Sequence, residues 1–287
     1  MPVAHLHDRA ILDVSGVDAE HFLQNLITTD LSTLKAGESL PGALLSPQGK
    51  ILFDFLISRT ADAAFRLECR SEVADEFVRR LMLYRLRAKV DIARTQAKSV
   101  AVIWAPDGPT LDDRQGLIDG RFAGSVLRGY DVPLPDANAT GSDWNAYRIA
   151  YGIAESGTDY ALGDAFPHDV LLDQIGGVGF QKGCYVGQEV VSRMQHRGTA
   201  RRRVLIAHGE SPLPAPGAEI SAGGRTIGTL GSASGKEGLA IVRIDRVKDA
   251  MDRGDAIMAA DVPIALAIPE WAKFSYPTSA DAEAGNA

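Results

Sequence analysis

The stretch Gln181-Lys182-Gly183-Cys184-Tyr185-Val186-Gly187-Gln188-Glu189 is the most informative part of this chain. It places one of only two cysteines beside a lysine and between two glycines. Glycines let the backbone bend sharply and approach a ligand closely. The following residues, from Glu189 to Met194, are typical of the start of a helix, and a helix N-terminus and an ammonium group both favour thiolate over thiol. The stretch therefore predicts a reactive or ligand-facing Cys184, activated by Lys182.

A free cysteine has a simpler interpretation, as a small buried hydrophobe. Free cysteines are among the most buried residue types. A buried filler, however, needs neither the flanking Lys182 nor two glycines. We therefore expect Cys184 to be an activated thiol, and we expect Cys69, which lies on an apolar strand, to lack this property.

The run from Lys182 to Glu189, followed by His196-Arg197-Gly198 and Arg201-Arg202-Arg203, resembles the signature of the YgfZ family. Members of that family are folate-binding proteins related to the glycine-cleavage T-protein and tied to iron-sulfur cluster maturation. The resemblance implies tetrahydrofolate as cofactor, and iron-sulfur enzymes or cluster assembly proteins as partners. Three further stretches resemble parts of the same fold in the same order: Ile11 to Gln24, Pro47 to Lys50, and Val204 to Ile268.

The resemblance also implies a set of folate-contacting residues. Trp144 precedes the helix-like run to Gly152, and its ring could stack on a flat heterocycle or pack in the core. Ala150 departs from the T-protein pattern, which has a glutamate that accepts hydrogen bonds from the pterin. Its loss costs about 1–3 kcal/mol if the pterin donors are buried. The complete expected set is Trp144, Arg148, Gly183, Tyr185, Gln188, Glu189, Arg193 and Arg197.

Two functions of different classes follow from these residues. In the first, the chain is an accessory protein for assembly or repair of iron-sulfur enzymes, with Cys184 and Lys182 as the working pair. In the second, it is a folate-dependent aminomethyltransferase-like enzyme in which Asp54 supplies a carboxylate. Asp54 lies in a segment that resembles the one carrying the T-protein's catalytic acid, with a register uncertain by one residue, and it could equally be a structural residue. Whether the chain is an enzyme stays open.

Composition narrows the class of protein further. The chain has 287 residues, 45% of them hydrophobic, enough for two or three compact units. It lacks a long apolar stretch and a signal-like start, so we expect a cytoplasmic protein with no membrane partner. The two cysteines lie far apart in an apparently intracellular chain, so no disulfide framework is expected, and they are too few for the roughly four ligands of an iron-sulfur cluster. No metal site is predicted.

The charge pattern bears on the kind of ligand. A net charge of -7 makes nucleic acid an unlikely partner, although a related fold occurs in a tRNA-modification GTPase, so an RNA-associated role is a third and weaker interpretation. A local basic cluster nevertheless surrounds the cysteine and could bind the carboxylates of a folate tail, or could be a solvated helix face. It comprises Lys182, Arg193, Arg197, Arg201, Arg202 and Arg203.

Hydrophobic periodicity predicts an α+β fold. Residues 51–57 have the pattern of a buried strand, and residues 73–86 carry apolar side chains at helical spacing. From Val204 onward, short apolar runs separated by Gly and Pro predict an antiparallel barrel. We expect a folate-binding α+β region of two interwoven subdomains over 1–202, a barrel over 203–275 and a disordered tail over 276–287, as in the T-protein-like fold.

Overall fold

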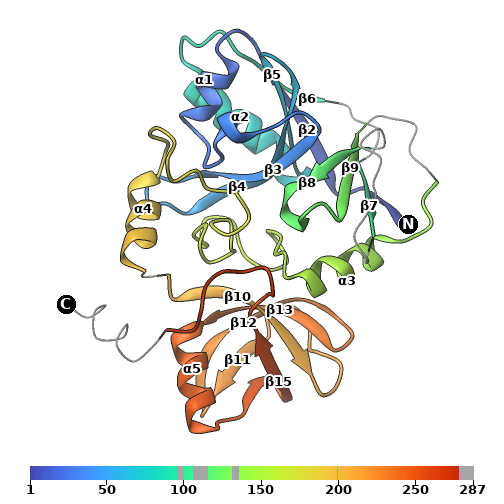
Figure 1. Cartoon of the computed structure of the whole chain (residues 1–287), viewed down its shortest axis with the longest axis vertical. Helices are drawn as coiled ribbons and strands as arrows, with labels where there is room; N and C mark the ends of the chain where they lie inside the picture. The colour runs from blue at the N-terminus through green and yellow to red at the C-terminus, as the bar shows by residue number, and fades with distance from the viewer. Residues whose placement is uncertain (96–99, 106–115, 131–135, 199, 278–287) are drawn as a thin grey trace. The chain divides into compact units, whose positions relative to one another are not determined.

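The computed structural model forms two compact units, and it confirms the α+β fold with a C-terminal barrel (Figure 1). Unit 1 contains residues 1–144 and 175–188, and unit 2 contains residues 145–174 and 189–287. The chain thus crosses between the units more than once. The described residues are 1–95, 100–105, 116–130, 136–198 and 200–277.

Unit 1 is built on a nine-stranded sheet with the order β1-β7-β9-β8-β3-β4-β5-β2-β6. Neighbouring strands are antiparallel except for β3 and β8, which run parallel. The strands are β1 (Val3–Leu6), β2 (Arg9–Ser15), β3 (Glu38–Leu45), β4 (Ile51–Ala61), β5 (Ala64–Arg70), β6 (Asp91–Thr95), β7 (Val100–Trp104), β8 (Leu117–Asp119) and β9 (Val126–Tyr130).

Short helices accompany this sheet and build its core. Alternation along β4 directs Phe53 and Phe55 to the same face, and both rings stack on Phe77 of α2, with centroids 4.7 and 5.4 Å away. The predicted helix at 73–86 is confirmed as α2. The helical segments of this part are α1 (Ala19–Gln24), α2 (Ala74–Arg85) and the 3₁₀ turns η1 (Leu31–Thr33), η2 (Ser71–Val73) and η4 (Gly120–Phe122).

Unit 2 contains a closed six-stranded antiparallel barrel with the order β10-β13-β12-β11-β14-β15. Strand β15 pairs back onto β10, which closes the barrel and leaves no free edge. Alternate residues such as Leu205, Ala207, Ala240 and Val242 fill its interior. The strands are β10 (Arg202–Gly209), β11 (Glu219–Ala222), β12 (Arg225–Ser234), β13 (Glu237–Arg243), β14 (Ile257–Ala259) and β15 (Val262–Ala267).

The described residues form three more helices: α3 (Gly141–Tyr151), α4 (Gln188–Arg197) and α5 (Ile244–Arg253). Helix α5 packs Ile244, Val247 and Ala250 into the barrel core. In the described part of the chain, no helix is long and apolar enough to cross a membrane. Most of the predicted tail, from residue 278, lies outside the described residues.

Candidate functional site

The two cysteines have opposite environments. Cys184 is exposed in the loop before α4, whereas Cys69 on β5 is 1% exposed within the sheet core. Burial, reinforced by the negative charge of Asp54, raises the pKa of the Cys69 thiol to about 12. Cys69 is therefore a structural residue, and any thiol chemistry of this chain falls to Cys184.

Lys182 anchors the cysteine loop. Its Nζ donates hydrogen bonds to the carbonyl oxygens of Ile27, at 2.8 Å, and Thr29, at 2.7 Å, just after α1. The side chain is nearly buried, and burial lowers its pKa to about 8, against a smaller opposing effect of the Asp30 charge. It forms no hydrogen bond with Cys184. Its ammonium group is held by backbone carbonyls, and activation of the Cys184 thiol by Lys182 stays a prediction.

Further bonds hold the same loop to the segment after α1. The Gly179 amide donates to the Thr28 carbonyl at 2.8 Å, and the Thr28 hydroxyl donates to the Gly177 carbonyl at 2.6 Å. The Tyr185 ring is buried, with the Lys182 ammonium 5.3 Å from its centroid. Burial raises the pKa of Tyr185 to about 12. Tyr185 thus helps to fix the loop while Cys184 next to it stays exposed.

The two glycines of the motif have different roles. Gly187 has a φ of +78°, and a Cβ there would lie 2.5 Å from the Ser46 carbonyl oxygen in the turn between β3 and β4. Only glycine fits both requirements. Gly183 has no positive φ, and a Cβ there would have no neighbour within 4 Å. The close backbone approach expected at both positions is therefore required only at Gly187.

Helix α4 begins at Gln188, close to the predicted start. The Gln188 amide donates to the Tyr185 carbonyl at 3.3 Å, which continues the loop into the helix. Glu189 and Arg193 form an exposed ion pair at 2.7 Å, and Arg197 is exposed near the helix end. Such an exposed pair contributes little to stability.

The predicted basic cluster is largely neutralised. Arg203 is buried and pairs with Asp173 at 2.7 Å, while it also donates to the His168 carbonyl. Arg202 pairs with Asp164 at 3.4 Å, and Arg201 lies 3.9 Å from the carboxylate of Asp245. With Lys182 anchored in unit 1, Arg197 is the one member without an ion-pair or hydrogen-bond partner among the described residues. The prediction of a free carboxylate-binding cluster is corrected accordingly.

Trp144 packs in the core of unit 1. It is 3% exposed, and its ring lies 5.7 Å from Trp104 and 5.3 Å from Phe122 between centroids. The Arg128 guanidinium lies 5.1 Å from its centroid. Of the two interpretations of Trp144, the structure displays the packed one, and a folate contact would require a face of the ring to be uncovered.

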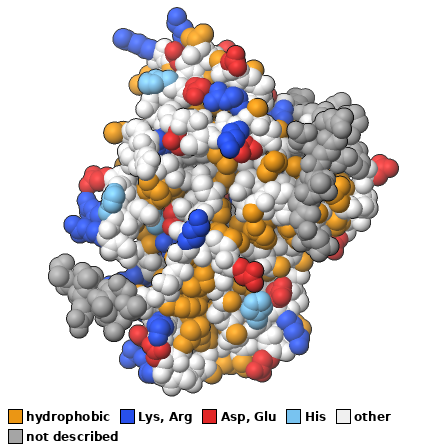
Figure 2. All heavy atoms as spheres, viewed as in Figure 1, with side chains coloured by type: hydrophobic (Ala, Val, Ile, Leu, Met, Phe, Trp, Pro, Cys, Tyr) orange, Lys and Arg blue, Asp and Glu red, His pale blue; other side chains and the backbone are white. Residues whose placement is uncertain are grey.

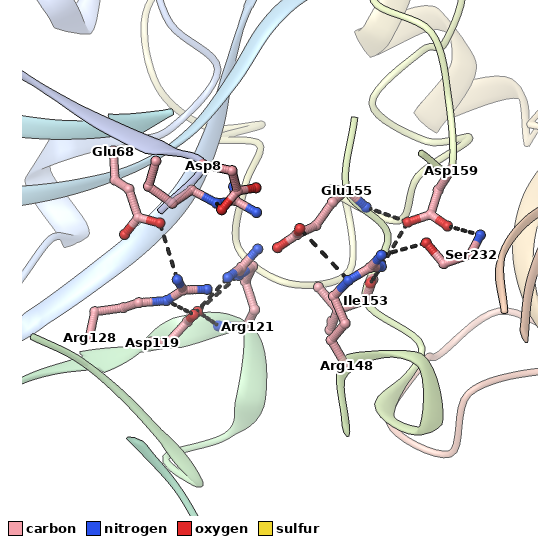
Figure 3. A network of polar contacts seen from close by, with 11 residues as sticks. Asp8, Glu68, Asp119, Arg121, Arg128, Arg148, Ile153, Glu155, Asp159 and Ser232 are labelled. Atoms are coloured by element: carbon pink, nitrogen blue, oxygen red, sulfur yellow. Dashed lines mark hydrogen bonds and ion pairs between the residues drawn. The ribbon is translucent and has the colours of Figure 1, made fainter. Parts of the chain in front are cut away.

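Arg148 is buried within unit 2, where it forms a polar network (Figure 3). Its guanidinium donates to Asp159 Oδ2 at 2.7 Å, to the Ile153 carbonyl at 2.9 Å and to the Ser232 hydroxyl. Asp159 also accepts from the amide of Ser232. In this structure the Arg148 guanidinium is therefore occupied by hydrogen bonds that link α3, the following loop and strand β12. Ala150, on the same helix, carries no acceptor.

Asp54 is half-buried on β4, where it lies opposite Ala43 of β3. Alternation places it on the face opposite Phe53 and Phe55. Glu68 shares that face, because Glu68 pairs with Leu56 two residues along. The predicted carboxylate thus lies on the side of the sheet that carries polar side chains.

A second buried network in unit 1 was not predicted (Figure 3). Arg128, fully buried on β9, pairs with Asp119 at 3.0 Å and with Glu68 at 3.1 Å, and Tyr130 donates to Glu68 at 2.6 Å. Burial alone would raise the pKa of Asp119, but Arg121 and Arg128 outweigh it and hold that pKa below its usual value. The sequence signal for this network is a charged residue within an otherwise apolar strand: Glu68 in β5, Asp119 in β8 and Arg128 in β9.

Comparison with known proteins identifies the family. Residues 5–109 match the GCVT N-terminal domain, and residues 201–274 match the CAF17 C-terminal beta-barrel domain. The chain is 30% identical to the human mitochondrial iron-sulfur cluster assembly factor IBA57 over 93% of this chain and 84% of the human protein. The chain belongs to the IBA57 family. The mouse IBA57 is 29% identical over 96% of this chain and 85% of its own length.

A solved structure resembles this chain in fold. The glycine cleavage system aminomethyltransferase T from Bartonella henselae matches with a TM-score of 0.74 and 16% identity, over 96% of this chain and 87% of that chain. This match confirms the predicted T-protein-like fold and carries no conclusion about activity. Within the residues that the structure describes, this IBA57 relative has no cluster of three or more His, Cys, Asp or Glu side chains that could hold a metal ion.

Proposed function

We propose that this chain serves the assembly or repair of iron-sulfur cluster enzymes, with Cys184 as its working thiol. The observation that carries the proposal is the contrast within one loop: Cys184 is exposed, while Lys182 beside it is tied by two hydrogen bonds to the segment after α1. An exposed thiol on an anchored backbone can meet a partner without first ordering the loop. The names of the IBA57 relatives support the same role. The resemblance of the cysteine motif to the YgfZ signature supports the choice of Cys184 as the thiol.

A single thiol limits the chemistry that can be assigned to Cys184. One thiolate supplies one ligand, whereas a cluster usually needs about four. A cluster or an iron ion handled by this chain is therefore cargo, and the client supplies the remaining ligands. The residues of this chain orient the thiol: Lys182 and Tyr185 fix the backbone, and Gly187 lets it pass close to Ser46.

We extend the proposal to tetrahydrofolate as a bound molecule, on the strength of the motif and of the T-protein-like fold. The expected side chains fit it poorly in this structure, since Trp144 is packed, Arg148 is paired and Ala150 offers no acceptor. No step of the proposed function runs through folate. Calorimetry with tetrahydrofolate tests the extension: a dissociation constant that Trp144→Phe leaves unchanged would remove Trp144 from the folate site.

The alternative function is a folate-dependent one-carbon transferase in which Asp54 acts. Its half-buried position on the polar face of the sheet is what favours it. Complementation of cells that lack this chain, with matched variants, distinguishes the two functions. Cys184→Ser should fail to restore iron-sulfur enzyme activity, while Asp54→Asn and the control Cys69→Ser should restore it. The opposite pattern, with Cys184→Ser active and Asp54→Asn inactive, would establish the transferase.

We propose, as a separate point, that the chain is cytoplasmic. The curated relatives carry the word mitochondrial in their names, and the sequence of this chain led us to expect the cytoplasm. Fractionation of its own cells, with detection of the untagged chain, tests that expectation.

A further inference from the structure

Helix α2 carries apolar side chains on two faces. Its inner face buries Phe77 and Leu81 against the core of unit 1. On the outside, Met82 is 41% exposed, Leu83 is 70% exposed and Leu86, at the helix end, is 90% exposed. A helix that only covers a sheet needs one apolar stripe. Met82, Leu83 and Leu86 are not among the residues of the described core of unit 1.

Unpaired arginines surround these apolar side chains. Among the described residues, six arginines have neither an ion-pair nor a hydrogen-bond partner in the described part of the chain, and four of them lie on or directly after α2. Figure 2, drawn in the view of Figure 1, shows basic, acidic and hydrophobic side chains together at the end of unit 1 that carries α1 and α2. The six are Arg79, Arg80, Arg85, Arg87, Arg197 and Arg225.

Leu86 also has a backbone conformation that leucine avoids. Its φ is +44° and its ψ is -106°, and the Ala88 amide donates to the Arg85 carbonyl at 2.8 Å. These are features of the first central position of a type II′ turn, where glycine is normal. An exposed leucine there is unfavourable in the free protein twice over, by backbone strain and by apolar exposure. Such local conflicts concentrate at binding sites.

We propose that the outer face of α2, with Arg79, Met82 and Leu83, and the turn that follows it, with Leu86 and Arg87, form a docking surface for a protein with carboxylates around an apolar pocket. Leu86 would enter the pocket, and the arginine forks would bind carboxylates in two-bond geometry. Arginine and methionine are enriched in protein interfaces and lysine is depleted, which favours a protein over a lipid surface. Helix α2 and the turn after it carry four arginines against Asp75 and Glu76, and Asp75 pairs with Arg94, so this part of the chain is basic although the net charge is -7.

This surface goes beyond the proposed function, because it does not involve the thiol. Helix α2 packs on β2 and β6, whereas the cysteine loop lies against the segment after α1 and the turn between β3 and β4. A partner held on α2 can therefore be bound without Cys184. Variants on one surface should leave the other intact.

A defined probe tests the chemistry of the surface: a fluorescent helical peptide of Leu, Glu and Ala with its leucines on one face and glutamates on both sides. Fluorescence anisotropy with the full chain should show saturable binding. Leu86→Gly, and separately Arg79→Glu with Arg87→Glu, should each weaken binding at least about tenfold, and a Gln-for-Glu peptide should bind at least about tenfold more weakly. Met251→Ala and Arg225→Glu, at exposed positions in unit 2, are the matched controls.

Melting temperatures of the variants show whether a loss of binding comes from unfolding or from the altered surface. Glycine relieves the positive φ, so Leu86→Gly should have a melting temperature no lower than that of the parent chain. Four results would overturn the proposal: no saturable binding of the acidic peptide, equal losses in the control variants, stronger binding to vesicles of phosphatidylglycerol and phosphatidylcholine than to the peptide, or self-association that Leu86→Gly abolishes.

Discussion

Lys182 donates a 2.7 Å hydrogen bond to the carbonyl oxygen of Thr29, across 153 positions of sequence. The bond joins the cysteine motif to the segment after the first helix, and a second bond to Ile27 makes the attachment two-point. The lysine two residues before Cys184 therefore anchors the loop. The thiol depends on this anchor for its position.

The pH dependence of stability should report the buried ammonium group of Lys182. Its pKa is about 8 in the folded chain and 10.5 in the unfolded chain. Between these values the unfolded state binds more protons, so stability rises with pH. The burial penalty is complete below about pH 8 and is relieved as the pH approaches 10.5.

The measurement is urea denaturation of the parent chain and of Lys182→Met from pH 7 to 10.5. The free energy of unfolding of the parent chain, minus that of Lys182→Met, should increase as the pH rises from about 8 to 10.5. Lys236→Met, in the exposed turn between β12 and β13, controls for removal of a lysine. A difference that stays constant with pH would show that the Lys182 ammonium group is not buried as described.

The two motif glycines should respond differently to alanine. Gly187→Ala adds a Cβ at positive φ and 2.5 Å from a carbonyl oxygen, so it should lower the free energy of unfolding by about 1–3 kcal/mol or more. Gly183→Ala meets open space and should change it by less than about 0.5 kcal/mol. Urea denaturation of both variants measures this, and equal effects would contradict the loop geometry.

The Asp159 carboxylate should be a major contributor to the stability of unit 2. It accepts hydrogen bonds from Arg148, from the Glu155 amide and from the Ser232 amide, each at 2.7 Å. Asp159→Ala removes the nearest carboxylate of the buried Arg148, whose other carboxylate, Glu155, lies 3.7 Å away, and should cost about 3–5 kcal/mol. Glu189→Ala breaks an exposed ion pair and should cost less than about 0.5 kcal/mol. A small effect at Asp159 in thermal unfolding would show that water replaces it.

Thiol counting should separate the two cysteines. In the native chain, a disulfide-exchange reagent should label Cys184 alone, since Cys69 is 1% exposed and its pKa is raised to about 12. In guanidinium both thiols should react. Mass spectrometry of the labelled peptides identifies the site, and fast native labelling of Cys69 would exclude a structural role for it.

Local patterns predicted much of this fold, because helices and strands follow from neighbouring residues. The helix at Ala74–Arg85 and the start of α4 were predicted from apolar spacing and from the motif. Asp18 occupies the N-cap position of α1, yet its carboxylate makes no capping bond there and instead accepts from the distant Lys89 amide at 2.8 Å. Such a choice between local and distant donors depends on the assembled fold.

The candidate site was harder to predict for the same reason. A basic residue beside a motif can face a ligand, a carboxylate or a carbonyl, and the sequence does not say which. Arg203 was expected to bind ligand and pairs with Asp173, 30 residues away, and Arg148 reaches Ser232, 84 residues away. These partners come from segments that only the fold brings together. The exposure of Cys184 followed more directly from its polar and glycine-rich neighbours.

The central claim is that the exposed thiol of Cys184 carries the iron-sulfur role, and alkylation followed by add-back tests it most directly. The native chain is alkylated under conditions that modify Cys184 and spare Cys69, and is then added to extract from cells that lack it. The account predicts that the unmodified chain restores iron-sulfur enzyme activity and the alkylated chain does not. Equal restoration by both would contradict it.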